Sequence, residues 1–233
     1  MYKRVILKLS GEALSGDSEK SFDNNTINRI IEQIKSILEK GIEVCLVVGG
    51  GNFWRGRSAD SNMDRCVADQ IGMMATIMNA LYLSDSFSQY GINATVMTPF
   101  SVGTMTEEFS KKKALHYLKE KKVLIFAGGI GHPFFSTDTI TALRASELSA
   151  DLILFAKSID GVYDKDPAIH SDAKKFETIP CKDIVEKNLK VIDIAAANLC
   201  YEQKIPVLIF GLLEENSIIK ASLGEKIGTI VTV

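Results

Sequence analysis

Three glycine-rich stretches carry residue types that could hold phosphate groups. Each follows a short apolar run and combines backbone N–H groups with a cation or hydroxyls; they are Lys8 to Gly11, Gly49 to Gly51 and Gly128 to Asp138. Glycine has no Cβ, so such loops can approach a ligand closely and adopt positive φ without steric cost. Arg55, four residues beyond Gly51, adds a forked guanidinium suited to phosphate oxygens. The pattern predicts a site for more than one phosphate group.

Charged and polar side chains strengthen this prediction, although each has a simpler explanation. Lys8 lies in an apolar run, where its charge is costly to bury unless it faces an anion, but it could reach water from an edge strand. Ser136, Thr137 and Asp138 begin a helix whose N-terminus favours phosphate, and the same residues are common helix caps. Arg55 could lie on the surface beside an ordinary turn. Because three such loops coincide, phosphate binding is the better explanation.

Apolar runs and helical patterns alternate along the chain, which is typical of an α/β domain with a mainly parallel sheet. Strands are expected at residues 5–9, 43–48, 94–98, 123–127, 152–156, 206–210 and 228–233. Helices are expected at residues 27–38, 63–89, 106–119, 138–149, 182–187, 193–203 and 217–223. Residues 160–180 are irregular and could form a small hairpin or a lid. No low-complexity linker interrupts the pattern, so residues 1–233 are expected to form a single domain, with ligands bound beyond the carboxyl ends of the strands.

The first two helices are predicted in more detail from their spacing. One face of the first is lined by Ile27, Ile30, Ile31, Ile34, Ile37 and Leu38, with Asn25 or Thr26 as the N-cap. In the second, core packing is the interpretation of Met73, Met74, Ile77, Met78 and Leu81. Asp69 interrupts the start of this helix, and its placement needs a reason. A later run, Lys111 to Lys113, is expected to be a solvated helix face.

The composition excludes several classes of function. The chain has 233 residues, of which 46% are hydrophobic and 24% charged, and its net charge of −2 gives no basic field for nucleic acid. No run approaches the roughly 20 apolar residues of a membrane span, and the N-terminal residues predict a strand rather than a signal peptide. The cysteines form no metal-like pair, and Cys45 and Cys200 have the apolar neighbours of buried free thiols. We expect a reduced, cytoplasmic protein without a histidine or metal cluster.

Several nucleotide-binding fingerprints are absent. No glycine precedes a lysine, so there is no P-loop of the G-x-x-x-x-G-K-[ST] type. Trp54 and Phe134 stand where a dinucleotide fingerprint needs its last glycine. The H-R-D and D-F-G motifs of protein kinases do not occur.

Four segments resemble those of the bacterial UMP kinases, which have the amino-acid kinase fold. They are Lys8 to Leu14, Gly49 to Gly56, Gly131 to Asp138 and Asp160 to Pro167, in matching order and spacing over essentially the whole chain. The first two indicate the wider superfamily, which includes kinases of carboxylates and carbamate, whereas the run Pro133 to Asp138 points to UMP. The resemblance implies a three-layer αβα sandwich with a mainly parallel central sheet (amino-acid kinase or carbamate kinase-like fold). It also implies a nucleoside monophosphate kinase that phosphorylates UMP to UDP with ATP in pyrimidine nucleotide biosynthesis.

The resemblance further implies which residues contact each nucleotide. ATP contacts would fall at Lys8, Leu9, Ser10, Gly11, Gly51, Arg55, Lys157, Tyr163 and Asp166, the last three around the adenosine. UMP contacts would fall at Gly50, Asp69, Ile130, Gly131, His132, Pro133, Phe134, Phe135, Ser136 and Thr137, with the Asp69 carboxylate accepting from sugar hydroxyls. Catalysis would fall to Lys8, Arg55 and Asp138, with Asp138 orienting Lys8 among the transferring phosphates.

Phosphoryl transfer to UMP needs no general base. The second pKa of the acceptor phosphate is near ~6, so it is largely deprotonated at neutral pH. The chemistry is then a matter of positioning and charge neutralisation, which Lys8, Arg55, the glycine amides and Mg²⁺ would supply. No dense carboxylate cluster suggests an all-protein metal cage, so Mg²⁺ is expected to be carried by ATP.

Two departures from the family pattern leave questions open. Lys157 and Ser158 stand where many members carry Thr or Asn followed by Lys or Asn, so either residue could make the ATP contact. Residues 16–22 lack the glycines that flank Phe in members regulated by GTP, so GTP activation and UTP feedback are not implied. The family is typically a homohexamer, and the helices at 27–38 and 73–81 could line its contacts.

Other functions compatible with this fold stay as alternatives. One is a superfamily enzyme that phosphorylates a carboxylate or carbamate, for which Asp69 and the run Phe134 to Thr137 would have no role. The others are a non-catalytic nucleotide sensor and a molybdenum or tungsten storage-type binder. Lys8, Arg55 and Asp138 argue against both of these.

Overall fold

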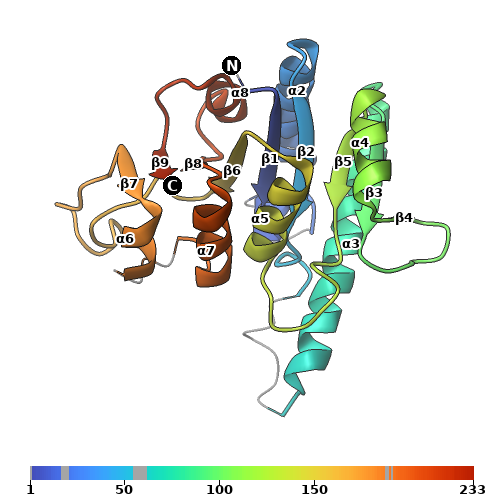
Figure 1. Cartoon of the computed structure of the whole chain (residues 1–233), viewed down its shortest axis with the longest axis horizontal. Helices are drawn as coiled ribbons and strands as arrows, with labels where there is room; N and C mark the ends of the chain where they lie inside the picture. The colour runs from blue at the N-terminus through green and yellow to red at the C-terminus, as the bar shows by residue number, and fades with distance from the viewer. Residues whose placement is uncertain (1, 17–20, 55–61, 187–188, 190) are drawn as a thin grey trace.

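The computed structural model describes residues 2–16, 21–54, 62–186, 189 and 191–233. Its strands are β1 (Arg4–Leu9), β2 (Glu43–Val48), β3 (Ala94–Thr98), β4 (Glu107–Glu108), β5 (Val123–Phe126), β6 (Leu152–Lys157), β7 (Thr178–Pro180), β8 (Val207–Gly211) and β9 (Thr229–Thr232). Its helices are α1 (Gly11–Ser15), α2 (Asn24–Glu39), α3 (Arg65–Gln89), α4 (Lys111–Lys119), α5 (Thr137–Leu148), α6 (Cys181–Glu186), α7 (Ile194–Gln203) and α8 (Ser217–Leu223). Strands and helices alternate through most of the chain (Figure 1).

The nine strands of the described residues form one sheet in the order β4-β3-β5-β2-β1-β6-β8-β9-β7. Neighbouring strands are parallel except β8 and β9, which pair antiparallel. β1 lies inside the sheet, between β2 and β6. Lys8 therefore does not extend to water from an edge strand, and the simplest explanation for that residue is excluded.

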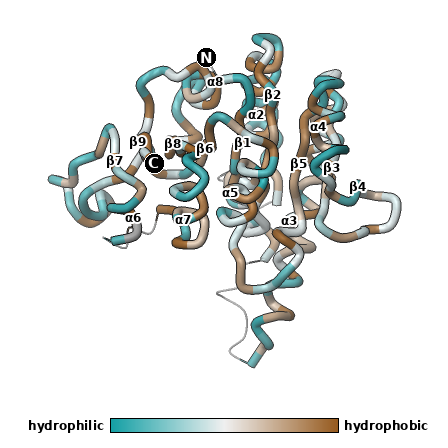
Figure 2. Tube along the Cα trace, viewed as in Figure 1, coloured by the Kyte–Doolittle hydropathy of each residue, from teal (hydrophilic) through white to brown (hydrophobic). Residues whose placement is uncertain are grey.

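Two apolar cores cover the two faces of the sheet. Because successive side chains of a strand point to opposite faces, β1 sends Val5, Leu7 and Leu9 into one core and Ile6 into the other. The first core is completed by α2, α3 and α8, and the second by α4, α5, α6 and α7. The inner strands β5, β2, β1, β6 and β8 are accordingly the apolar centre of the molecule (Figure 2). The predicted three-layer sandwich with a mainly parallel sheet is confirmed.

Some predicted element boundaries are wrong for local reasons. The N-cap of α2 is Asp23, not Asn25 or Thr26, because its carboxylate accepts hydrogen bonds from the N–H groups of both those residues. The helix predicted from residue 106 begins only at Lys111, because Ser110 caps it and residues 107–108 pair with β3. The short elements α1 and β7 were not predicted, since five and three residues carry too little periodicity. Within residues 160–180, Tyr163 and Lys175 form an antiparallel bridge, so this segment contains a small hairpin.

Part of α3 that was predicted to pack in the core is exposed on the surface. Met74 and Met78 are 49% and 46% exposed, so the interpretation of these two residues as core was wrong, whereas Ile77 is buried. The isoleucines that α2 was predicted to bury are all in the core. The side chains of residues 111–113 are exposed, as predicted. Over the described residues, no helix has the length and apolar character needed to cross a membrane.

The cysteines are free, and their burial matches the sequence pattern. Cys45 and Cys200 are almost fully buried, as predicted. Burial raises the pKa of each of these two thiols to about 12. Both thiols are therefore uncharged packing groups at neutral pH.

Candidate active site

A carboxylate shared by two lysines lies at the carboxyl end of the central strands. The Asp138 Oδ1 atom is 3.0 Å from Nζ of Lys8, and its Oδ2 atom is 3.8 Å from Nζ of Lys157. Their side chains are 10%, 12% and 23% exposed for Lys8, Asp138 and Lys157. Lys8 is the next-to-last residue of β1, Lys157 ends β6 and Asp138 lies in the first turn of α5, so three elements converge on one buried charge cluster.

Burial is the main electrostatic influence on Lys157. Desolvation lowers the pKa of its ammonium, and the attraction of Asp138 opposes this shift. The charge of Lys8 lowers the pKa further, and that of Asp193 raises it. The cluster thus holds two like charges close enough to repel each other.

The N-terminus of α5 is fixed by hydrogen bonds from two directions. Ser136 is its N-cap, with the side-chain oxygen accepting from the N–H groups of Asp138 (3.0 Å) and Thr139 (3.4 Å). Asp193 accepts from the hydroxyls of Ser136 and Thr139 and also caps α7 through the N–H of Ala196 (2.7 Å). Ser136 therefore caps the helix, as expected of such a residue, and fixes the position of Asp138, whereas its implied contact with UMP stays a prediction.

Asp193 is a site residue that the sequence did not reveal. In the sequence, Asp193 could be read only as a helix N-cap, because an acidic residue commonly precedes a helix. Its bonds to Ser136 and Thr139 arise from the packing of α7 beside α5, which spans more than fifty residues of sequence. No spacing rule connects residues at that separation.

The glycines after β1 and β2 allow two loops to touch each other. A Cβ at Gly11 would lie 2.4 Å from the N atom of Gly51, and one at Gly49 would lie 2.9 Å from the N atom of Gly11. A Cβ at Gly50 would lie 2.8 Å from that of Ala75 in α3. The expectation that glycine allows positive φ in these loops is wrong for the loop after β2, since none of Gly49, Gly50 and Gly51 has positive φ. It is right for the loop after β5, where Gly128, Gly129 and Gly131 have positive φ.

A cavity of 870 Å³ opens beside Lys8 on the side of α1 and α2. It brings together three of the residues implied as ATP contacts, Lys8, Ser10 and Lys157, and also has Ser158 in its lining. Leu9 is fully buried in the core, so only its backbone can meet a ligand.

The implied ATP contacts Gly11 and Gly51, which touch each other, are not in this lining, and Tyr163 and Asp166 lie apart from it in the hairpin within residues 160–180. The Tyr163 hydroxyl donates to Asp160 (2.7 Å), and Asp166 accepts from the N–H of Ala168 (2.9 Å). The remaining implied ATP contact and catalytic residue, Arg55, lies outside the described residues.

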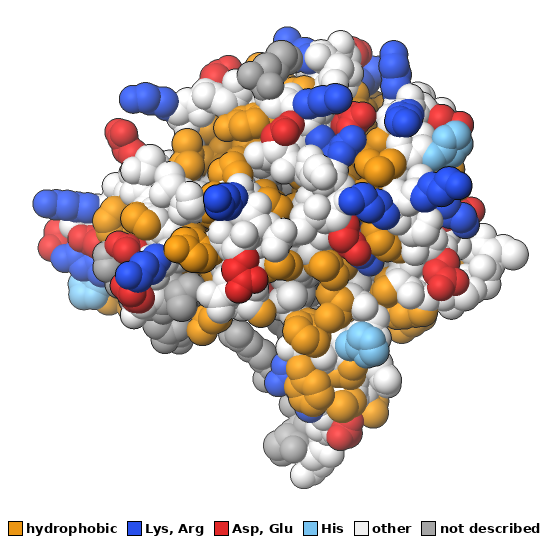
Figure 3. Space-filling view, in the orientation of Figure 1, with side chains coloured by type: hydrophobic (Ala, Val, Ile, Leu, Met, Phe, Trp, Pro, Cys, Tyr) orange, Lys and Arg blue, Asp and Glu red, His pale blue; other side chains and the backbone are white. Residues whose placement is uncertain are grey.

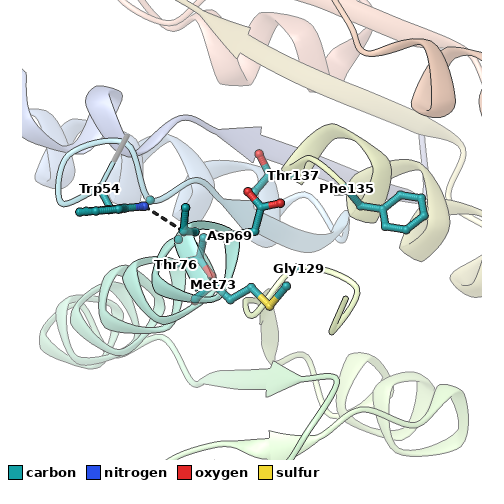
Figure 4. Close-up of a pocket in the computed structure, with 10 residues that line it drawn as sticks. Trp54, Asp69, Met73, Thr76, Gly129, Phe135 and Thr137 are labelled. Atoms are coloured by element: carbon teal, nitrogen blue, oxygen red, sulfur yellow. Dashed lines mark hydrogen bonds between the residues drawn. The ribbon is translucent and has the colours of Figure 1, made fainter. Parts of the chain in front are cut away.

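A smaller cavity of 160 Å³ lies between α3 and the loop after β5 (Figure 4). Its lining is Gly50, Trp54, Ala68, Asp69, Gly72, Met73, Thr76, Gly129, Phe135 and Thr137. Four of these were implied as UMP contacts: Gly50, Asp69, Phe135 and Thr137. The Trp54 indole N–H donates to the carbonyl of Ala68 (2.9 Å), so the ring is held against α3 (Figure 4).

Asp69 connects α3 to the loop after β5. Its Oδ2 atom accepts from the N–H of Phe134 (2.8 Å), and both carboxylate oxygens lie 3.1 Å from Nε of Arg65. Phe134 has a φ of 73°, an uncommon value for a residue with a Cβ, and its ring is 64% exposed beneath the Arg65 guanidinium. The carboxylate thus holds the loop that contains the other implied UMP contacts, Ile130, Gly131, His132, Pro133 and Ser136.

Comparison with known proteins agrees with this geometry. Residues 3–211 match the amino acid kinase family. The structure is similar to that of a UMP kinase from Bacillus anthracis (37% identity, TM-score 0.95, covering 99% of this chain and 96% of that one). It is also similar to a UMP kinase from Ureaplasma parvum (36%, 0.94, all of both chains) and to a uridylate kinase from Archaeoglobus fulgidus (28%, 0.74, covering 98% and 99%). The chain therefore belongs to the amino acid kinase family, in the group of the bacterial UMP kinases.

Proposed function

We propose that this protein transfers the γ-phosphoryl group of ATP to UMP, which gives ADP and UDP. The observation that carries the proposal is the position of the Lys8–Asp138 ion pair between two cavities. Lys8 lines the larger cavity, and Thr137, next to Asp138 in the chain, lines the smaller one. The larger cavity is assigned to ATP and the smaller, with the loop after β5, to UMP.

The residues present can perform this transfer by positioning and charge neutralisation. The phosphate of UMP is already a nucleophile at neutral pH, since its second pKa is about 6. Lys8 neutralises the charge of the transferring phosphoryl group, and Asp138 holds Lys8 in place at 3.0 Å. The N-terminus of α5 favours negative charge in the same region. Arg55 is proposed as a further cation, from the resemblance of its loop to those of the family.

Mg²⁺ is proposed to enter on the phosphates of ATP. Asp138, the carboxylate of the charge cluster, is shared by two lysines. Within the described ranges, no group of three His, Cys, Asp or Glu side chains could hold a metal ion. This donor set fits an ion carried by the nucleotide, which would neutralise phosphate charge during transfer.

Self-association through α3 is also proposed, with a homohexamer as the expected assembly. Val67, Ile71, Met74 and Met78 recur at helical spacing and are each at least 36% exposed. Apolar side chains gather on the projecting part of the molecule that contains the first turns of α3 (Figure 3). The apolar face of α2 is buried in the core and has no such role. Light scattering of the purified protein and of Met74→Glu measures the assembly, and an unchanged oligomer in the variant would exclude this face.

We also propose that the protein acts in the cytoplasm, in the supply of pyrimidine nucleotides. The free cysteines support a reducing compartment. A kinase of carboxylates or carbamate is the weaker alternative, since it leaves unexplained why Asp69 and Phe135 border the smaller cavity.

A coupled assay of ADP release tests the proposed reaction. Purified protein receives Mg-ATP with UMP, CMP, aspartate or glutamate in parallel, and release with UMP is expected. Turnover with none of these acceptors would refute the assignment to UMP and that to an aspartate or glutamate kinase. Arg55→Ala should lose far more activity than Lys112→Ala, whose lysine is exposed on α4; equal rates would remove Arg55 from the site.

A further inference from the structure

We propose that Lys157 is a second catalytic lysine, which binds the γ-phosphate of ATP together with Lys8 and does not contact the adenosine. The inference rests on the proposed kinase function and names a role for one residue of that site. It is carried by the shared carboxylate, whose two oxygens lie near the two ammonium groups.

The sheet register places Lys157 on the same face as Lys8. Lys8 is the partner of Phe155 in the parallel ladder between β1 and β6, and Lys157 lies two residues beyond Phe155. Side chains two residues apart share a face, and Nζ of Lys157 lies 5.3 Å from the centre of the Phe155 ring. A lysine one position later, where Ser158 stands, would point to the opposite face if the alternation of β6 continued. The ammonium group of Lys157 therefore lies near the Asp138 carboxylate because the lysine is at position 157 and not at 158.

The charges around Lys157 leave room for an anion. It is faced by Lys8 from β1, Asp138 from the first turn of α5 and Asp193 from the N-cap of α7. Asp193 already accepts hydrogen bonds from Ser136, Thr139 and the N–H of Ala196. Two ammonium groups then share the single carboxylate of Asp138 in a largely buried place, which is costly unless an anion arrives.

A transferring phosphoryl group is the anion that fits this place. Lys8, Lys157 and Ser10 line the cavity assigned to ATP. During transfer the bond from the γ-phosphorus to the oxygen of ADP breaks while a bond to an oxygen of UMP forms. Lys157 keeps its proton throughout and neutralises the charge on the phosphoryl oxygens.

Kinetics and binding of Lys157→Gln test this role, with Lys112→Gln as the matched control on an exposed lysine. The variant is expected to lose roughly 100-fold in kcat, the size of effect found when one charge-stabilising group is removed. Its affinity for a non-hydrolysable ATP analogue should fall roughly tenfold or more, with the affinity for ADP almost unchanged. Lys157→Arg keeps the charge and should recover part of kcat.

Three results would overturn the proposal. An equal loss of affinity for ADP and for the ATP analogue would place Lys157 on a part common to both, such as the adenosine. An unchanged kcat in Lys157→Gln would show that Lys157 has no catalytic role. A kcat of Lys157→Arg as low as that of Lys157→Gln would show that the positive charge is not what the reaction needs. If Lys157→Gln does not fold, judged by thermal unfolding, Lys157→Met keeps the apolar stem and takes its place. If the wild-type protein shows no turnover with UMP, the proposed function fails, while the two binding measurements still decide the contact of Lys157.

Discussion

Gly11→Ala is expected to destabilise the protein by forcing two loops of the active site apart. The added Cβ would lie 2.4 Å from the N atom of Gly51, 2.5 Å from Oδ1 of Asn52 and 2.9 Å from the carbonyl carbon of Gly50. Two of these are backbone atoms that cannot rotate away. The Asn52 amide is also fixed, because its Nδ2 atom donates to Asn79 (2.9 Å) and to the carbonyl of Ser21 (2.8 Å).

The size of the effect follows from opposing contributions. Overpacking of a filled interior costs about 1–3 kcal/mol, and contacts this short place Gly11→Ala near the upper end. Alanine is favoured over glycine in a helix by about 0.5–1 kcal/mol, which α1 recovers in part. The net loss is about 2 kcal/mol in the free energy of unfolding. For a chain of this size, the melting temperature should fall by roughly 4–8 °C.

Differential scanning calorimetry measures this change, with Gly72→Ala as the matched control. Gly72 lies within α3, and its added Cβ would meet only Cδ1 of Trp54 at 3.7 Å, an ordinary contact. This control should gain about 0.5–1 kcal/mol in stability. A Gly11→Ala protein as stable as the wild type would show that the two loops do not touch, and the explanation given for their glycines would be wrong.

Three further changes probe the rest of the site. Asp193→Ala removes the acceptor of the Ser136 and Thr139 hydroxyls, so kcat in the coupled assay should fall at least about tenfold; wild-type kinetics would exclude a positioning role. Phe134→Gly removes the strain of a left-handed backbone, so the free energy of unfolding, measured by urea denaturation, should rise by about 1 kcal/mol. A fall in this free energy would mean that the contacts of the exposed ring stabilise the protein by more than the backbone strain costs. Iodoacetamide at pH 8 should modify the half-buried Cys66 before Cys45, whose buried thiol has a pKa of about 12; mass spectrometry showing the reverse order would contradict this burial.

The parts of the fold that repeat a pattern were predictable from sequence. The inner strands of the sheet are runs of mostly apolar residues, and α2 buries the isoleucines that its spacing selects. The helix expected from residue 106 failed because Glu107 and Glu108 pair with β3, a contact between segments that local propensity does not contain. The exposure of Met74 and Met78 could not be foreseen either, since apolar residues on all sides of a helix fit both a core and an interface.

For the site, sequence indicated which loops meet but not how their side chains are used. Lys8 and Asp138 were expected together, and they form an ion pair. Lys157 was expected near adenosine, yet its ammonium lies near Asp138 because of the strand register. The triple glycine was expected to make room for ligands, and Gly50 does line the smaller cavity, but Gly49 and Gly50 also make room for other parts of the protein. The register of paired strands and the close approach of two loops depend on segments far apart in the chain, so residue types alone do not predict them.

The position of β1 inside the sheet also has a consequence for synthesis on the ribosome. Its neighbour β2 begins at Glu43, but its other neighbour β6 begins only at Leu152. Between the two, about 100 residues must be added, which at about 5–20 residues per second takes roughly 5–20 s. During that interval one side of β1 has no partner for its N–H and C=O groups and is open to pairing with another nascent chain. The strand that provides Lys8 is thus the first strand of the protein to be made, but it gains its second partner only when β6, the strand that ends in Lys157, has been added.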